Sequence, residues 1–81
     1  MNAAQTINEY TTFLQASQKE YESKGMGTNF RRMADEGVTY FMQVTNGIRL
    51  DRIVQNEVVE TLYPSMHEAV LTLSTGGWER V

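Results

Sequence analysis

Side chains that could carry out catalysis are few in this 81-residue chain, and they stand apart from one another. His67 is the only histidine, and the sequence contains no cysteine. Histidine catalysis needs a partner group, and a zinc site needs several Cys or His ligands. We therefore interpret His67 as a surface residue and predict neither a metal nor a cofactor. Without cysteine there is also no thiol chemistry and no disulfide.

Neighbouring acidic residues are the raw material of acid–base catalysis, and they occur at three places: Glu20/Glu22, Asp35/Glu36 and Glu57/Glu60. None is embedded in the apolar sequence that tunes a carboxyl group for proton transfer. The serines and threonines lack the nucleophile-elbow pattern. The glycines at 25 and 27 lack the remaining residues of a phosphate-binding loop. The sequence therefore predicts a protein that is not an enzyme.

Arg31 and Arg32 follow Phe30 and form the only local basic cluster with an aromatic residue. Such pairs can contact phosphates and bases. On a helix, however, Asp35 and Glu36 would lie four residues further along and neutralise the two arginines. The whole chain has seven basic and ten acidic residues, a net charge of −3, whereas nucleic-acid binding depends on neutralising phosphates. Nucleic acid is therefore the less favoured partner for this segment.

The bulk composition is that of one folded domain spanning residues 1–81, with 41% hydrophobic and 21% charged residues. No apolar run is long enough to cross a bilayer. Residues 1–6 lack the basic start and apolar run of a secretion signal. Together with the absence of cysteine, these features predict a cytoplasmic protein with no membrane partner.

The first element predicted is an amphipathic helix over 6–24. Thr6 and Glu9 fit a capping box at its start, and Gly25 is expected to end it. The segment 30–37 is ambiguous. A short helix that ends at Gly37 is slightly favoured, and the alternative is a hairpin turn at 35–37 leading into the strand that follows.

A β-meander is predicted for the centre of the chain. Apolar and polar residues alternate over 38–44, which is the period of a strand, and an Asn-Gly turn motif follows. A three-residue loop over 45–47, with Gly47 left-handed, pairs Val44 with Ile48. A two-residue turn would mix core with charged residues. Since a shift of one residue moves every side chain to the other face, we predict the three-residue loop.

The same test predicts the second turn. A loop over 55–57 pairs Val54 with Val58, and it pairs Arg52 with Glu60 as a cross-strand ion pair. Three strands then share one apolar face, formed by Val38, Tyr40, Met42, Val44, Ile48, Leu50, Val54, Val58 and Leu62.

The last part of the chain predicts a second helix. Ser65 and Glu68 form a capping box before apolar residues at helical spacing, and the Gly-Gly pair at 76–77 ends the helix. The tail over 78–81 either forms a short strand or packs as coil, with Trp78 expected to hold the chain end against the core.

The predicted fold class is α+β: an N-terminal helix, a three-stranded antiparallel β-meander, a C-terminal helix and an optional short terminal strand. This α-β-β-β-α order is that of a double-stranded-RNA-binding domain. Such domains contact RNA through basic residues at the start of the last helix. Here that helix contains no Lys or Arg, so we do not assign the chain to that family.

The second face of the predicted sheet is neither a plain solvated surface nor a core. It carries Thr39, Phe41, Gln43, Arg49, Asp51, Ile53, Val59, Thr61 and Tyr63. Two interpretations follow: the first helix covers part of this face, which is slightly favoured, or the face binds a partner or a second copy. In the second case the expected contact residues are Phe41, Arg49, Ile53 and Tyr63, with the Arg31/Arg32 segment.

The function predicted from these features is non-enzymatic macromolecular interaction. The leading hypothesis is a small accessory or inhibitor protein, of the kind that phages and mobile elements encode, that binds a host protein and could form a homo-oligomer. The alternative is a nucleic-acid-binding module built on the meander. A weaker alternative is an oligomer that sequesters a small ligand at a subunit boundary.

Overall fold

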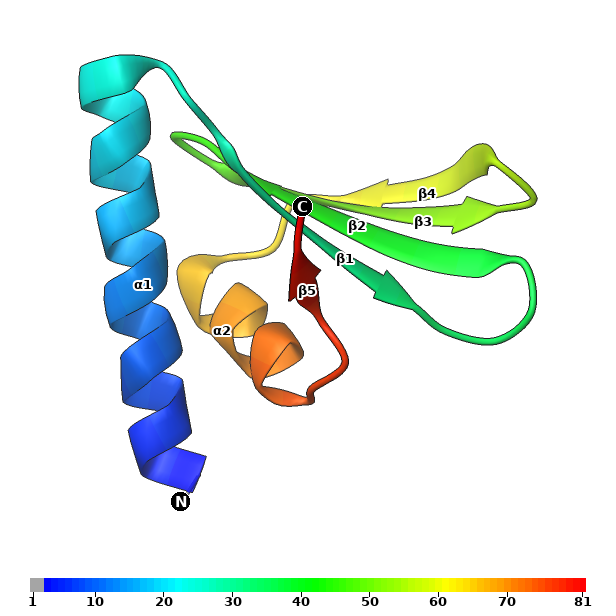
Figure 1. Cartoon of the computed structure of the whole chain (residues 1–81), viewed down its shortest axis with the longest axis horizontal. Coiled ribbons are helices and arrows are strands. Elements are labelled where there is room, and N and C mark those ends of the chain that lie inside the picture. Colours follow the sequence, from blue (N-terminus) through cyan, green and yellow to red (C-terminus); the bar gives the residue numbers. More distant parts are fainter. Residues whose placement is uncertain (1–2) are drawn as a thin grey trace.

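Two helices pack on one face of an antiparallel sheet in the computed structural model, which describes residues 3–81 (Figure 1). Along the chain the elements are α1 (Ala3–Lys24), β1 (Thr28–Met33), β2 (Val38–Val44), β3 (Ile48–Val54), β4 (Glu57–Leu62), α2 (Met66–Ser74) and β5 (Glu79–Arg80). The strand order across the sheet is β4-β3-β2-β1-β5. Met1 and Asn2, which belong to the segment 1–6 considered above for a secretion signal, lie outside the described residues.

The predicted α+β class is confirmed, but the count of three strands is wrong. The segment that we favoured as a short helix is strand β1, which pairs antiparallel with β2. Burial alternates along its first half, with Phe30 buried and Arg31 exposed, so strand periodicity decided the structure. The hairpin alternative holds instead: the N–H of Val38 donates to the carbonyl of Asp35 at 2.9 Å, and Gly37 has a φ of 73°.

The fourth long strand also removes the likeness in element order to double-stranded-RNA-binding domains. Four consecutive strands now separate the two helices, where that order has three.

The β2–β3 hairpin has the predicted register. Val44 pairs with Ile48, Met42 with Leu50, and the loop between the strands has three residues. Gly47, however, does not adopt the predicted left-handed conformation. The loop closes with a hydrogen bond from the N–H of Thr45 to the carbonyl of Gly47 at 2.9 Å.

The β3–β4 hairpin follows the prediction only away from its turn. Arg52 pairs with Glu60 as expected, but Val54 pairs with Glu57 and not with Val58. Gln55 (φ 51°) and Asn56 (φ 67°) are both left-handed and form a two-residue turn, which matches the twist of a hairpin. A bulge between Arg52 and Ile53 restores the register beyond the turn and moves Val58 opposite Ile53, onto the face away from the helices.

The helix ends agree with prediction at three of four positions. Helix α1 begins before Thr6, so the predicted box at Thr6 and Glu9 does not start it. Gly25, at φ 71°, ends α1 as expected, and its N–H donates to the carbonyl of Tyr21 at 2.8 Å. Helix α2 has the predicted capping box, with Ser65 Oγ accepting from the Glu68 N–H at 3.2 Å. It ends before Gly76, whose φ is 89°.

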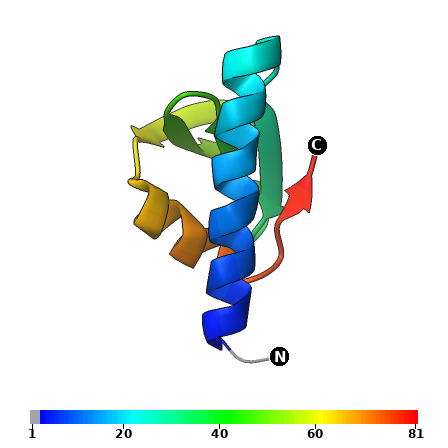
Figure 2. The same ribbon diagram turned by 90° about the vertical axis from the view of Figure 1, so that its left-hand side faces the viewer.

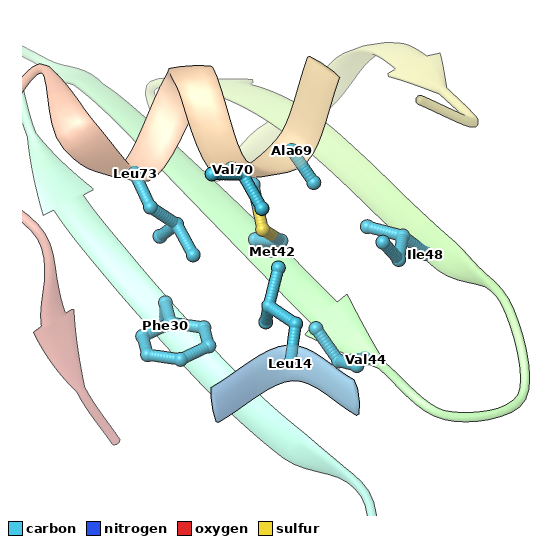
Figure 3. Packing of buried hydrophobic residues seen from close by; sticks show 8 residues of the cluster. All are labelled: Leu14, Phe30, Met42, Val44, Ile48, Ala69, Val70 and Leu73. Atoms are coloured by element: carbon cyan, nitrogen blue, oxygen red, sulfur yellow. The ribbon is translucent and has the colours of Figure 1, made fainter. Parts of the chain in front are cut away.

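The core lies between the helices and the sheet and is small (Figure 3). Its buried apolar side chains are Leu14 from α1, Ala69, Val70 and Leu73 from α2, and Phe30, Met42, Val44 and Ile48 from the sheet. Trp78 packs against this cluster and donates from Nε1 to the carbonyl of Thr72 at 3.1 Å, as expected for a residue that holds the chain end.

Helix α1 contributes Leu14 to the same face of the sheet that α2 covers, and the two helices lie side by side (Figure 2). The favoured interpretation that α1 covers the second face of the sheet is therefore wrong. The Phe41 and Arg49 positions belong to a face that no element of residues 3–81 overlies. Neither helix of this part of the chain has the length and apolar character to span a bilayer.

Candidate protein-binding face of the sheet

The face opposite the helices, here called the outer face, is defined by strand pairing. Side chains alternate between the two sides of a sheet, so each residue paired across strands shares a face with its partner. Three cross-strand rows result. The polar row is Asn29, Gln43 and Arg49; the charged row is Glu79, Arg31, Phe41, Asp51 and Thr61; the apolar row is Met33, Thr39, Ile53 and Val58. Tyr63, the residue after β4, lies beside Gln43 and Arg49 and is counted with the polar row.

Asp51 is the buried charge of the outer face. Its Oδ1 accepts a hydrogen bond from Thr61 Oγ1 at 2.8 Å, and its Oδ2 lies 3.2 Å from Arg49 Nε. A buried carboxylate is tolerated when it is hydrogen-bonded and paired in this way. Asp51 therefore has partners on both oxygens and holds the side chain of Arg49.

The other ion pair of the charged row lies at the opposite edge of the sheet. Arg31 donates from Nη2 and Nε to the same oxygen of Glu79, at 2.7 and 3.1 Å. Both side chains are exposed, so the pair contributes little to the free energy of unfolding. It does tie β5 to β1 and leaves no net charge at this edge.

The polar row contains the two buried side-chain polar atoms that lack a hydrogen bond among the described residues, Asn29 Oδ1 and Arg49 Nε. Arg49 Nε is close to Asp51, but its N–H is not aligned with the carboxylate. By strand pairing both residues are neighbours of Gln43. Unpaired buried polar groups are rare in folded proteins and call for an explanation.

Two shallow hollows lie at opposite ends of the outer face. One, of about 250 Å³, is lined by Gln43, Thr45, Gly47, Ile48, Arg49 and Tyr63. The other, of about 470 Å³, lies between the β1–β2 and β3–β4 turns and takes its apolar lining from Met33 and Ile53. The outer face therefore offers hydrogen-bond donors at one end and apolar surface at the other.

Of the six predicted contact residues, five lie together on the outer face: Arg31, Phe41, Arg49, Ile53 and Tyr63. The sixth residue lies on the other side of the sheet. Arg32 is the next residue along β1, so it points to the helix side, where its side chain packs on Gly77 within 3.1 Å of the position that a Cβ would occupy.

Sequence reasoning missed Asn29, Met33 and Glu79, because it slightly favoured a short helix over a hairpin for 30–37 and left the tail as either strand or coil. The alternation of Thr28, Phe30 and Arg32 with the residues between them was the pattern that could have located β1.

The described residues contain no cluster of three or more His, Cys, Asp or Glu side chains that could hold a metal ion. His67 is exposed on α2, as interpreted from the sequence. The arrangement on the outer face is suited to binding, with anchors, donors and paired charges on a rigid sheet. No protein-family model matches the chain, and comparisons with curated proteins and with solved structures find no match.

Proposed function

We propose that this protein is a non-enzymatic binding protein that acts in the cytoplasm, and that its outer face contacts a protein partner. A small accessory or inhibitor protein of a phage or mobile element fits this description. One observation carries the proposal: both helices pack on the inner face, so the outer face stays open although it carries Phe41, Ile53 and Tyr63 beside two arginines. Aromatic residues and Arg are the types enriched at protein interfaces.

The amount of exposed surface supports the proposal. The chain exposes 5539 Å², whereas a compact monomer of 9.3 kDa exposes about 5,000 Å². Its radius of gyration is 12.8 Å, against about 11.7 Å for a compact domain of this length. The excess is of the order that one side of a modest interface covers.

The charge of the outer face favours a protein over a nucleic acid. By strand pairing it carries two basic residues, Arg31 and Arg49, and two acidic residues, Asp51 and Glu79, which are paired with them. Nucleic-acid binding requires several unpaired cations along a backbone. Two alternatives stay predictions: a nucleic-acid partner, and an oligomer that sequesters a small ligand.

The test uses the two most exposed large hydrophobic residues of the outer face, one at each end. Tyr63 is 78% exposed and Met33 is 72% exposed, so the variant Met33→Ser with Tyr63→Ala should keep the melting temperature within a few degrees. Met26→Ser is the matched control, because Met26 is 64% exposed and lies in the α1–β1 loop, outside the outer face. Reversing the charge of Arg49 is a poorer test, since it would set a second carboxylate beside buried Asp51.

The measurement is capture of the tagged protein from native lysate treated with nuclease, followed by mass spectrometry and by titration of the recovered partner. We expect a stoichiometric protein partner that the wild type and Met26→Ser bind equally and that the double variant binds at least tenfold more weakly, since interface anchors commonly contribute that much. Recovery of the bait alone, loss of the partner with nuclease, or equal binding by the double variant would each contradict the proposal.

A further inference from the structure

The polar row of the outer face is incomplete in the isolated chain. Its two unpaired buried atoms, an acceptor on Asn29 and a donor on Arg49, flank the side-chain amide of Gln43, which can both donate and accept. Gln43, Arg49 and Tyr63 also line one hollow of about 250 Å³. Gln43 and Arg49 of the polar row therefore line a hollow at one end of the outer face, and the unpaired acceptor of Asn29 lies on the neighbouring strand.

Arg49 is held with its terminal nitrogens free. Asp51 faces Nε at 3.2 Å and is itself fixed by Thr61 at 2.8 Å. Within residues 3–81 the two Nη groups of Arg49 form no hydrogen bond, and the ion pair with Asp51 is shortest at Nε. An arginine whose Nε faces a buried carboxylate keeps its planar Nη pair available for a second acceptor.

We propose that the polar row binds a carboxylate from an acidic side chain of the protein partner, with Arg49 as the main donor and Gln43 and Tyr63 beside it. This proposal rests on the proposed function, because it specifies the chemistry of the partner. The Nη pair of Arg49 matches the two oxygens of a carboxylate. A hollow of this size admits one such group.

Charge complementarity selects a carboxylate over a phosphate backbone. The site offers one guanidinium, whose charge Asp51 balances in part from the Nε side. A singly charged side chain can bind there, whereas most charges of a run of phosphates would find no cation to neutralise them. The apolar row predicts a second feature of the partner, an apolar side chain. Ile53 is four residues from Arg49 on β3, about 13 Å along the strand, so the partner carries an apolar side chain at that distance from its acid.

Asp51 is a positioning residue in this site. A buried ion pair contributes little to stability compared with apolar packing, so stability alone does not explain an Asp in the middle of the sheet. Asp51→Asn keeps an acceptor for Thr61 but removes the charge that orients Arg49. Carboxylate binding should therefore weaken at least fivefold in Asp51→Asn, while far less change is expected in the melting temperature.

The test is an NMR titration of the full chain that follows the arginine Nε–Hε and the Gln43 side-chain amide signals. The probe is N-acetylglutamate α-amide, which has one side-chain carboxylate, and the matched control is N-acetylglutamine amide at the same ionic strength. We expect saturable shifts at Arg49 and Gln43 with millimolar affinity for the acidic probe, and none for the neutral one. Arg49→Gln should abolish them, and Arg31→Gln should leave them unchanged.

Equal responses to both probes, a linear response without saturation, or binding that survives in Arg49→Gln would overturn the proposal. Tighter binding of N-acetylglycine, a mimic of a chain terminus, would overturn the assignment to a side chain. Steeply salt-dependent binding of a single-stranded oligonucleotide at Arg49 would overturn the choice of partner. If the captured protein partner binds Arg49→Gln as tightly as the wild type, this proposal fails while the proposed function stands.

Discussion

Asp51 is the residue around which the polar side chains of the outer face are arranged. It is buried, accepts from Thr61 and lies against Nε of Arg49 on the same strand, whereas the cross-strand pair of Arg52 and Glu60 is exposed with 3.8 Å between Nε and Oε1. Asp51 and Arg52 are adjacent on β3, but their two acid–base pairs differ in burial. Their contributions to stability should differ for that reason.

At this scale we predict that Asp51→Ala lowers the free energy of unfolding by about 1–3 kcal/mol, because it leaves the Thr61 hydroxyl without its acceptor and the Arg49 guanidinium without its paired charge. Glu60→Ala, the matched control, should cost less than about 1 kcal/mol, since exposed pairs contribute little. Equilibrium denaturation in urea measures both. Equal losses for the two variants would show that Asp51 has no structural role beyond that of a surface acid.

At the scale of elements, the register of the sheet depends on the conformation of its turns. The bulge at Val59 and the two-residue turn at Gln55 and Asn56 together move Val58 to the outer face. Gln55 is left-handed, a conformation that costs a glutamine more than an asparagine or glycine. Gln55 is exposed at the tip of a loop, so a substitution at this position changes only the local conformation.

We therefore predict that Gln55→Asn raises the free energy of unfolding by roughly 0.5–1 kcal/mol, because asparagine favours the left-handed positions of such turns. The same substitution at Gln18, within α1, should give no gain, since asparagine is a weaker helix former. Thermal unfolding compares the two. A destabilised Gln55→Asn would contradict the assigned turn.

Elements with strong local patterns were predictable from the sequence. The capping box at Ser65, the glycine that ends α1 and the β2–β3 register all follow from side chains close in sequence. Strand β1 was not predictable in this way, because Arg31 and Arg32, together with the acidic residues that follow them, also fit a helix. Only the pairing of this segment with β2 decides between helix and strand. The β3–β4 turn was missed because neither Gln55 nor Asn56 is a glycine.

The residues of the outer face were likewise predictable only where the strands and their register were predictable. The outward residues of β2 and β3 were predicted, because the register of that hairpin was predictable. The Asn29 and Met33 contributions, and the position of Arg32 on the other side, required β1 to be recognised as a strand. That the face lies open depends on where α1 packs, which no local pattern in the sequence specifies.

At the scale of the whole molecule, a thin core and a large exposed surface occur together. Among the residues whose burial is described, eight apolar side chains are buried, and the chain exposes about a tenth more surface than a compact monomer of its size. Domains of this size have small margins of stability. A partner that binds only the folded state would add to that margin by mass action. Both properties are consistent with a protein that works in a complex.

The central claim is that the outer face is covered when the partner binds. Because the chain has no cysteine, a single introduced cysteine reports its own accessibility. The measurement is the rate of iodoacetamide alkylation of Met33→Cys, on the outer face, and of Met26→Cys, outside it, with and without the captured partner. We predict that the partner slows alkylation of Met33→Cys at least tenfold and leaves Met26→Cys unchanged. Unchanged reactivity of Met33→Cys in a complex that has formed, or protection of Met26→Cys in its place, would contradict the account.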